Sequence, residues 1–159
     1  MVLRFLTIGA DHFKGGGSAH RVLKPDGKFV FSHWLGPDQS ECYKILFDVL
    51  GRHVDMTRAD PAPNAYALSD KDQVVAMMQK AGFHGIRSKT VNNVLHAPAP
   101  SFFDFFMSFG VRVPLILQRQ DKSVVAVVRE EIDDLASKYF SDGIYMIPMP
   151  SVIYSGTVG

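Results

Sequence analysis

The stretch that decides the fold runs from Arg21 to Trp34 and reads RVLKPDGKFVFSHW. Near its middle, the sequence Lys-Pro-Asp-Gly at 24–27 is typical of a tight turn. Proline fixes φ there, and the aspartate and glycine tolerate the bent and left-handed backbone that a chain reversal needs. The turn separates a segment at 18–23, which predicts a short helix, from a strand that follows it.

The segment after the turn predicts a buried strand at 28–32. Its centre, Phe-Val-Phe at 29–31, is apolar at consecutive positions, which is typical of a strand covered by helices on both faces, as in a parallel sheet. His33 and Trp34 follow where this strand ends. Because ligands of open α/β sheets bind beyond the carboxyl ends of the strands, both residues are candidates for a binding site. The alternative is that Trp34 only closes the end of the sheet.

Three segments together resemble one protein family. RVLKPDGKFVFSHW resembles the segment that leads into the fifth strand of class I S-adenosylmethionine-dependent methyltransferases, of the type 11 or ubiquinone-biosynthesis-like kind. YALSDKDQVVAMMQKAGFHGIRSKTV at 66–91 is similar to that family's next helix, its AGF cap and its sixth strand. IYMIPMPSVIYSGTV at 144–158 is similar to its last strand. The resemblance covers roughly residues 20–159.

The resemblance implies an α/β fold with a partial Rossmann-like sheet of about four strands and flanking helices. The strands would lie in the order 2–8, 28–32, 144–158 and 85–94, with the last pair antiparallel. Only the C-terminal half of such an enzyme is matched, and the glycine-rich cofactor loop has no counterpart. We therefore expect one truncated methyltransferase-like domain over residues 1–159.

The resemblance also implies a function, a transferase that moves a methyl group from S-adenosylmethionine to a small, apolar acceptor. The loop after the 28–32 strand lies near the acceptor in this family, so His33 is the candidate base and Trp34 a candidate acceptor contact. Gly9 and Ala10, after the expected first strand, are the candidates for contacting the cofactor. The other readings are a non-catalytic binding or interaction domain, or a carrier of small apolar ligands.

A phenylalanine-rich segment at 101–109, SFFDFFMSF, starts with Ser101 as the expected N-cap and predicts a helix that is apolar on nearly every side. Such a helix is buried all round or else covers a ligand or a partner. The family resemblance places acceptor-covering helices here, so Phe102 and Phe106 are candidate substrate contacts, and the alternative is that they belong to the core. Three further helices are expected. One spans 37–53 with Pro37 in its first turn, and the next runs from Ser69 to a left-handed cap at Gly82. The third spans 121–139, with Leu135 on its buried face and Asp133 exposed.

Composition excludes several classes of function. Lys and Arg number 17 against 16 Asp and Glu, so no electrostatic footprint for nucleic acid or an anionic membrane is present. A single cysteine, Cys42, excludes an internal disulfide and fits a reducing compartment, and no apolar run approaches the ~20 residues of a membrane span. The six histidines lack metal-ligand spacing, and the glycines at 15–17 read as a flexible turn. We expect a cytoplasmic protein whose partners are a small-molecule acceptor and a second copy or another chain that covers the edge of the sheet.

Overall fold

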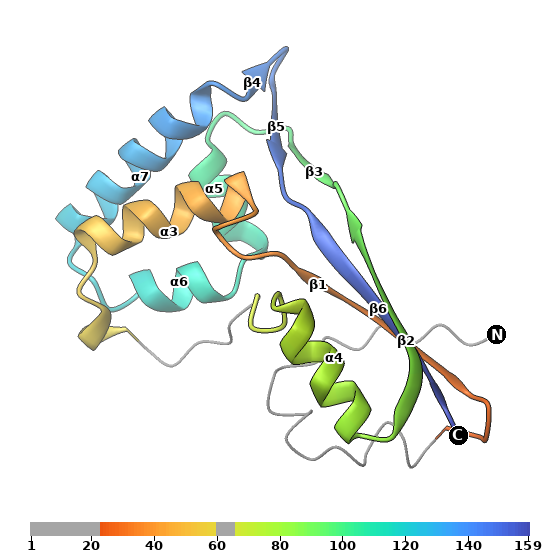
Figure 1. The fold of residues 1–159 in the computed structure, drawn as a ribbon. Coiled ribbons are helices and arrows are strands. Elements are labelled where there is room, and N and C mark those ends of the chain that lie inside the picture. Colours follow the sequence, from red (N-terminus) through yellow and green to blue (C-terminus); the bar gives the residue numbers. More distant parts are fainter. Residues whose placement is uncertain (1–22, 60–65) are drawn as a thin grey trace. The chain divides into compact units, whose positions relative to one another are not determined.

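The computed structural model describes residues 23–59 and 66–159, which belong to two compact units (Figure 1). Unit 1 contains the described residues up to Leu35 together with 66–92 and 150–159. Unit 2 contains the described residues of 36–59 and 93–149. Both combine helices with an antiparallel sheet, so the expected α/β class is confirmed.

Unit 1 is built on a three-stranded sheet of β1 (Lys28–Trp34), β6 (Ser151–Val158) and β2 (Phe83–Val91), in the order β1-β6-β2. The central strand β6 runs antiparallel to both neighbours, so β1 and β2 run parallel to each other. Between β1 and β2 the chain first contributes helical segments to unit 2 and then forms α4 (Lys71–Lys80), which packs on β2. The expected order of these three strands and the antiparallel last pair are confirmed.

The core of unit 1 lies between this sheet and α4. Phe31 stacks on Tyr154 of the central strand with ring centroids 5.1 Å apart, and Val74 and Met78 of α4 join the same buried cluster. Side chains alternate between the faces of a strand, so Val30 lies on the opposite face, where it is 37% exposed. The expectation that both faces of this strand are covered is therefore wrong for Val30.

Local backbone chemistry sets the ends of these elements. In the turn before β1, Gly27 N–H donates to the Lys24 carbonyl at 2.8 Å, and Asp26 has a positive φ of 60°. The left-handed cap expected at Gly82 is confirmed by its φ of 89°. The expected start of α4 at Ser69 is wrong, because the Asp70 carboxylate accepts from the backbone N–H groups of the first turn and so caps the helix one residue later.

Unit 2 combines a short sheet with helices. Its sheet has the order β3-β5-β4, with antiparallel pairs throughout, and the sequence did not predict it as a separate sheet. Its elements are α3 (Glu41–His53), the 3-10 helix η1 (Met56–Arg58), β3 (Val94–Ala97), α5 (Phe102–Phe109), α6 (Arg112–Leu117), α7 (Lys122–Ser137), β4 (Phe140–Ser141) and β5 (Ile144–Pro148).

Two of the expected strands are each divided in the structure. The expected strand at 144–158 forms β5 and β6, which belong to different sheets, and the break falls at Met149–Pro150. The expected strand at 85–94 likewise forms β2 and β3. Pro150 has no backbone N–H to donate to a ladder, which is consistent with its place between β5 and β6.

Side-chain caps also correct two expectations in unit 2. Ser40 caps α3 by accepting from Tyr43 N–H, so the helix begins at Glu41 and Pro37 lies before it. Asp133 of α7, expected to be exposed, accepts hydrogen bonds from Ser101 Oγ and Phe103 N–H, both at 2.8 Å, and so fixes the first turn of α5. Leu135, expected on the buried face of α7, is 36% exposed, because Ala136 takes the buried position.

Some expectations fall on residues outside the described part of the chain. These are the strand at 2–8, the loop with Gly9 and Ala10, and most of the short helix at 18–23. Among the residues that are described, no helix is long and apolar enough to cross a membrane.

Candidate functional site

The sequence-predicted site lies at the carboxyl end of β1 in unit 1. The strand was expected to end at residue 32, which is wrong, because the ladder with β6 continues through His33 and Trp34, the last two residues of β1. The register places His33 opposite Val152 and Trp34 opposite Ser151 of the central strand. On the far side of β6, Thr90 of β2 also faces Val152. Directly paired residues share a face, so His33 and Thr90 lie on the face that α4 covers, and Trp34 lies on the opposite face.

The surroundings of His33 favour the neutral form of its ring. Its ring is half-buried, and this burial lowers its pKa, although a backbone hydrogen bond to Trp34 opposes the shift. Nδ1 lies 3.4 Å from the Trp34 carbonyl oxygen. Because a carbonyl only accepts, Nδ1 is the donor, and the neutral ring keeps the lone pair on Nε2. A neutral imidazole with a free Nε2 is suited to take up a proton.

Trp34 is the last residue of β1 and is 38% exposed. The next residue, Leu35, is buried, and its N–H donates to the Pro150 carbonyl at 3.0 Å, which ties the end of β1 to the start of β6. The backbone at Trp34 is thus held on both sides while its ring remains accessible.

Polar groups from α4 and β2 lie on the His33 face of the sheet. Lys71 Nζ donates to Thr90 Oγ1 at 3.0 Å. The Tyr154 hydroxyl donates to the Leu68 carbonyl at 3.2 Å, and burial, with a smaller effect of Asp70, raises the pKa of Tyr154 to about 12. Tyr154 is 0% exposed, so its hydroxyl belongs to the core, and the accessible polar pair on this face is Lys71 and Thr90. Over residues 23–59 and 66–159, no group of three His, Cys, Asp or Glu side chains could hold a metal ion.

The phenylalanine-rich helix α5 lies in unit 2 and is largely buried. Phe102 is 0% exposed and packs on Tyr145, with ring centroids 5.8 Å apart. Phe106 is 4% exposed and meets Tyr43 edge-on at 6.4 Å. This burial is what the core interpretation expects. A role of Phe102 and Phe106 in binding an acceptor stays a prediction.

A second polar cluster, which sequence reasoning missed, joins α3 to α7 in unit 2. Arg52 and His53 at the end of α3 both donate to the Glu131 carboxylate, and these bonds lower the pKa of Glu131. Beside His53 is an open hollow of about 180 Å³, lined also by Ser123, Val124 and Val127. His53 and Glu131 are separated by 78 residues, so no sequence spacing pointed to the pair.

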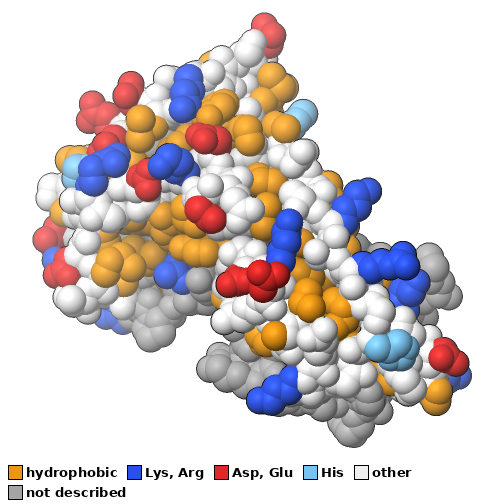
Figure 2. Space-filling view, viewed as in Figure 1, with side chains coloured by type: hydrophobic (Ala, Val, Ile, Leu, Met, Phe, Trp, Pro, Cys, Tyr) orange, Lys and Arg blue, Asp and Glu red, His pale blue; other side chains and the backbone are white. Residues whose placement is uncertain are grey.

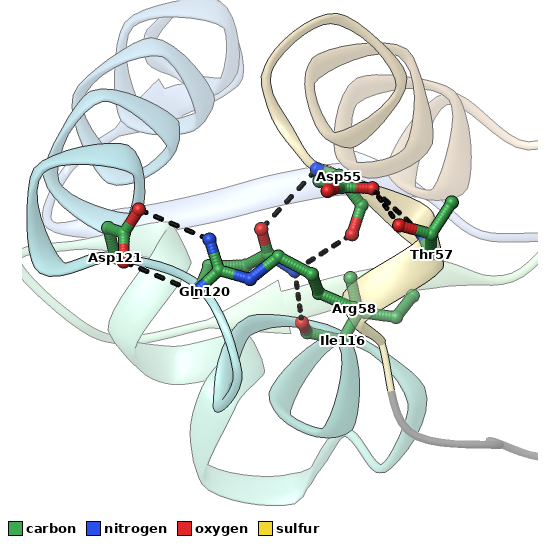
Figure 3. Close-up of polar contacts among 6 residues, drawn as sticks. All are labelled: Asp55, Thr57, Arg58, Ile116, Gln120 and Asp121. Carbon is green, nitrogen blue, oxygen red and sulfur yellow. Dashed lines mark hydrogen bonds and ion pairs between the residues drawn. The ribbon is translucent and has the colours of Figure 1, made fainter.

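Next to this cluster, hydrogen bonds join the segment around η1 to the loop before α7 (Figure 3). Gln120 Nε2 donates to the Asp55 carbonyl at 3.0 Å, and Asp55 N–H donates to Gln120 Oε1. Arg58 donates both terminal nitrogens to the Asp121 carboxylate at 3.2 Å. These polar groups bond one another, so we interpret the hydrogen bonds between the two segments as structural.

Cys42 and Arg112 are two further residues of unit 2 whose side chains carry reactive or charged groups. Cys42 is 0% exposed, and burial raises the pKa of its thiol to about 12, so it is an inert core side chain. Sequence reasoning did not single out Arg112, although its position in the sequence is unusual. It is the single charge within the apolar run FGVRVPLIL at 109–117.

Comparison with known proteins gives likenesses of structure only. No protein-family model matches the chain, and no curated protein matches it by sequence. The YcgJ protein from Bacillus subtilis is similar over 94% of this chain and 58% of its own length, with 14% identity and a TM-score of 0.47. Haemonchus contortus phosphoethanolamine N-methyltransferase 2, in complex with S-adenosyl-L-methionine, is similar over 93% of this chain and 30% of its own length, with 16% identity and a TM-score of 0.41. The chain thus spans less than two thirds of either protein.

Proposed function

We propose that the chain forms the acceptor-side part of a methyltransferase that transfers a methyl group from S-adenosylmethionine to a small, apolar acceptor. One observation carries the proposal, namely the sheet order of unit 1. β1, which follows RVLKPDG, and β2, which begins at the phenylalanine of AGF, run parallel to each other. The last strand, β6, lies between them and is antiparallel to both. This is the order that the sequence resemblance implies for the fifth, last and sixth strands of the family.

The described residues do not by themselves fit the cofactor. No glycine-rich loop follows any of the described strands, and β1 ends in His33 and Trp34 rather than in an acidic residue for a ribose. Gly9 and Ala10 remain proposed cofactor contacts outside the described residues. The chemistry assigned to this chain is therefore that of the acceptor. His33 and Trp34 lie on opposite faces of the sheet, so the acceptor is placed beyond the carboxyl end of β1, where both faces meet. There Trp34 contacts its apolar body, and His33 Nε2 takes the proton that an attacking hydroxyl or amine group loses.

The test is a methyl-transfer assay on the protein purified from its own cells, with any bound chains retained. With methyl-labelled S-adenosylmethionine, we expect label in an apolar, solvent-extractable product. Trp34→Ala is expected to lower the rate by about 10-fold or more, since a misplaced acceptor loses its near-attack geometry. Val30→Ala is the matched control, because Val30 lies on the same face of the same strand and is 37% exposed against 38% for Trp34. Equal rates for the two variants would contradict the assigned role of Trp34.

A non-catalytic binding or interaction domain is the second candidate. The sequence observation that favours it is the absence of a complete dinucleotide pattern, since Gly-Gly-Gly-Ser-Ala-His at 15–20 fails at its last position. Absence of labelled product from the intact, natively purified protein would overturn the methyltransferase proposal in favour of this one.

A further inference from the structure

The Arg112 side chain is partly buried, and none of the described residues is its counter-ion. Its guanidinium carbon lies 5.6 Å from the centre of the Phe47 ring, and its Nε is buried with no hydrogen-bond partner. No carboxylate of the described residues is paired with it. By contrast, Arg52, Arg58 and Arg129 of the same unit each donate to a carboxylate, of Glu131, Asp121 and Asp104 respectively.

This arrangement has an energetic cost in the free protein. A buried donor that has lost water and gained no partner costs about 1–3 kcal/mol, and more when the group is charged. The cation–π contact with Phe47 offsets only part of this cost, since such contacts contribute about 0.5–2 kcal/mol. An anion that accepts from the outer guanidinium nitrogens would supply a counter-charge for Arg112.

The surroundings of Arg112 are aromatic and apolar. Ring contacts run from Phe47 to Tyr43 at 5.9 Å, from Tyr43 to Phe106 at 6.4 Å and from Phe106 to Phe109 at 5.0 Å. Phe109 is 48% exposed, and Val111, next to Arg112 in the chain, is 58% exposed. Figure 2 shows hydrophobic side chains gathered on the surface between α3 and α6 of this unit. Tyr43 and Phe106 in the middle of this row are buried, so the accessible rings are the half-buried Phe47, next to the guanidinium, and the exposed Phe109.

We propose that Arg112 and the aromatic row bind a small molecule that carries one carboxylate on an apolar or aromatic body. The carboxylate would accept from the guanidinium, and the body would cover the exposed rings. A monoanion is favoured over a phosphate dianion, because one unpaired positive charge faces an apolar surface. The proposal goes beyond methyl transfer, since this binding involves unit 2 alone and needs no S-adenosylmethionine.

The experiment measures ligand binding to the full chain by calorimetry and by thermal shift. The probes are 4-phenylbutyrate, its uncharged analogue 4-phenylbutanol, and inorganic phosphate. The variants are Arg112→Met and the matched control Arg129→Gln, because Arg129 also stacks on a phenylalanine, Phe103, but is paired with Asp104. We expect saturable binding of 4-phenylbutyrate to the wild type and to Arg129→Gln, with at least about 10-fold weaker binding to Arg112→Met and to 4-phenylbutanol.

A second readout separates ligand binding from a structural role of Arg112. Since its Nε is unpaired in the free protein, Arg112→Met is expected to unfold at the wild-type temperature or above it. A marked fall in that temperature would show that Arg112 stabilises the fold instead and would overturn the proposal. Equal affinity of 4-phenylbutyrate for Arg112→Met, equal binding of the alcohol, or binding of phosphate alone would each overturn it too.

Discussion

Tyr154 offers a direct test of the packing in unit 1. Its side chain is 0% exposed, its ring stacks on Phe31, and its hydroxyl donates to the Leu68 carbonyl at 3.2 Å. Tyr154→Phe keeps the ring and removes only the hydroxyl. At neutral pH the variant leaves the Leu68 carbonyl without this donor, so we expect a loss of about 1–3 kcal/mol in the free energy of unfolding.

Alkaline pH gives the larger and more specific effect. Burial raises the pKa of Tyr154 from 10.0 to about 12 in the folded protein. Between these values the unfolded chain has lost the phenolic proton while the folded protein keeps it, so the folded state binds more protons. The contribution of Tyr154 to the free energy of unfolding is therefore fully present below pH ~10. It falls as the pH rises towards 12, by about 3 kcal/mol for two pKa units. Phenylalanine does not titrate, so Tyr154→Phe lacks this decline.

The measurement is urea unfolding between pH 7 and about pH 11.5, followed by the fluorescence of Trp34 and by circular dichroism. Trp34 is the single tryptophan of the chain and belongs to unit 1, as Tyr154 does. Both proteins carry Cys42→Ala, because the buried Cys42 thiol has its pKa raised to about 12 and adds a second alkaline decline. Wild type is expected to lose its advantage over the variant as pH rises above 10. Parallel declines in the two proteins would refute the reasoning.

Three further predictions concern the helix α5, the cofactor and assembly. If Phe102 and Phe106 belong to the core, as their burial indicates, substitution of either by alanine is expected to lower the free energy of unfolding by about 3–5 kcal/mol, measured in thermal melts. If they line a pocket instead, the same substitutions would weaken ligand binding and leave the fold intact. The isolated chain is expected to bind S-adenosylmethionine weakly or not at all in calorimetric titration, because its sequence has no complete cofactor loop, and tight saturable binding would contradict this. Val30 and Trp34 expose apolar surface on the sheet face opposite α4, so we expect self-association or a partner chain there, and sedimentation as a compact monomer at tens of micromolar would count against it.

The features that the sequence determined are those set by neighbouring residues. The turn before β1, the cap of α5 by Ser101 and the left-handed Gly82 each follow from the backbone preferences or the short side chains of a few consecutive residues. The strand order of unit 1 was also predicted, but through family resemblance, since pairing between distant strands has no local signal.

The tertiary structure decided what depends on distant partners. Residues 144–158 look like one strand, yet β5 and β6 belong to separate sheets because their pairing partners differ. Asp133 looked like a solvated residue until α5 placed Ser101 and the Phe103 N–H within hydrogen-bond distance. Arg112 becomes half-buried, with no carboxylate partner among the described residues, only when α3 places Phe47 next to its guanidinium. Burial and charge pairing are properties of the folded neighbourhood, and a chain segment does not carry that information by itself.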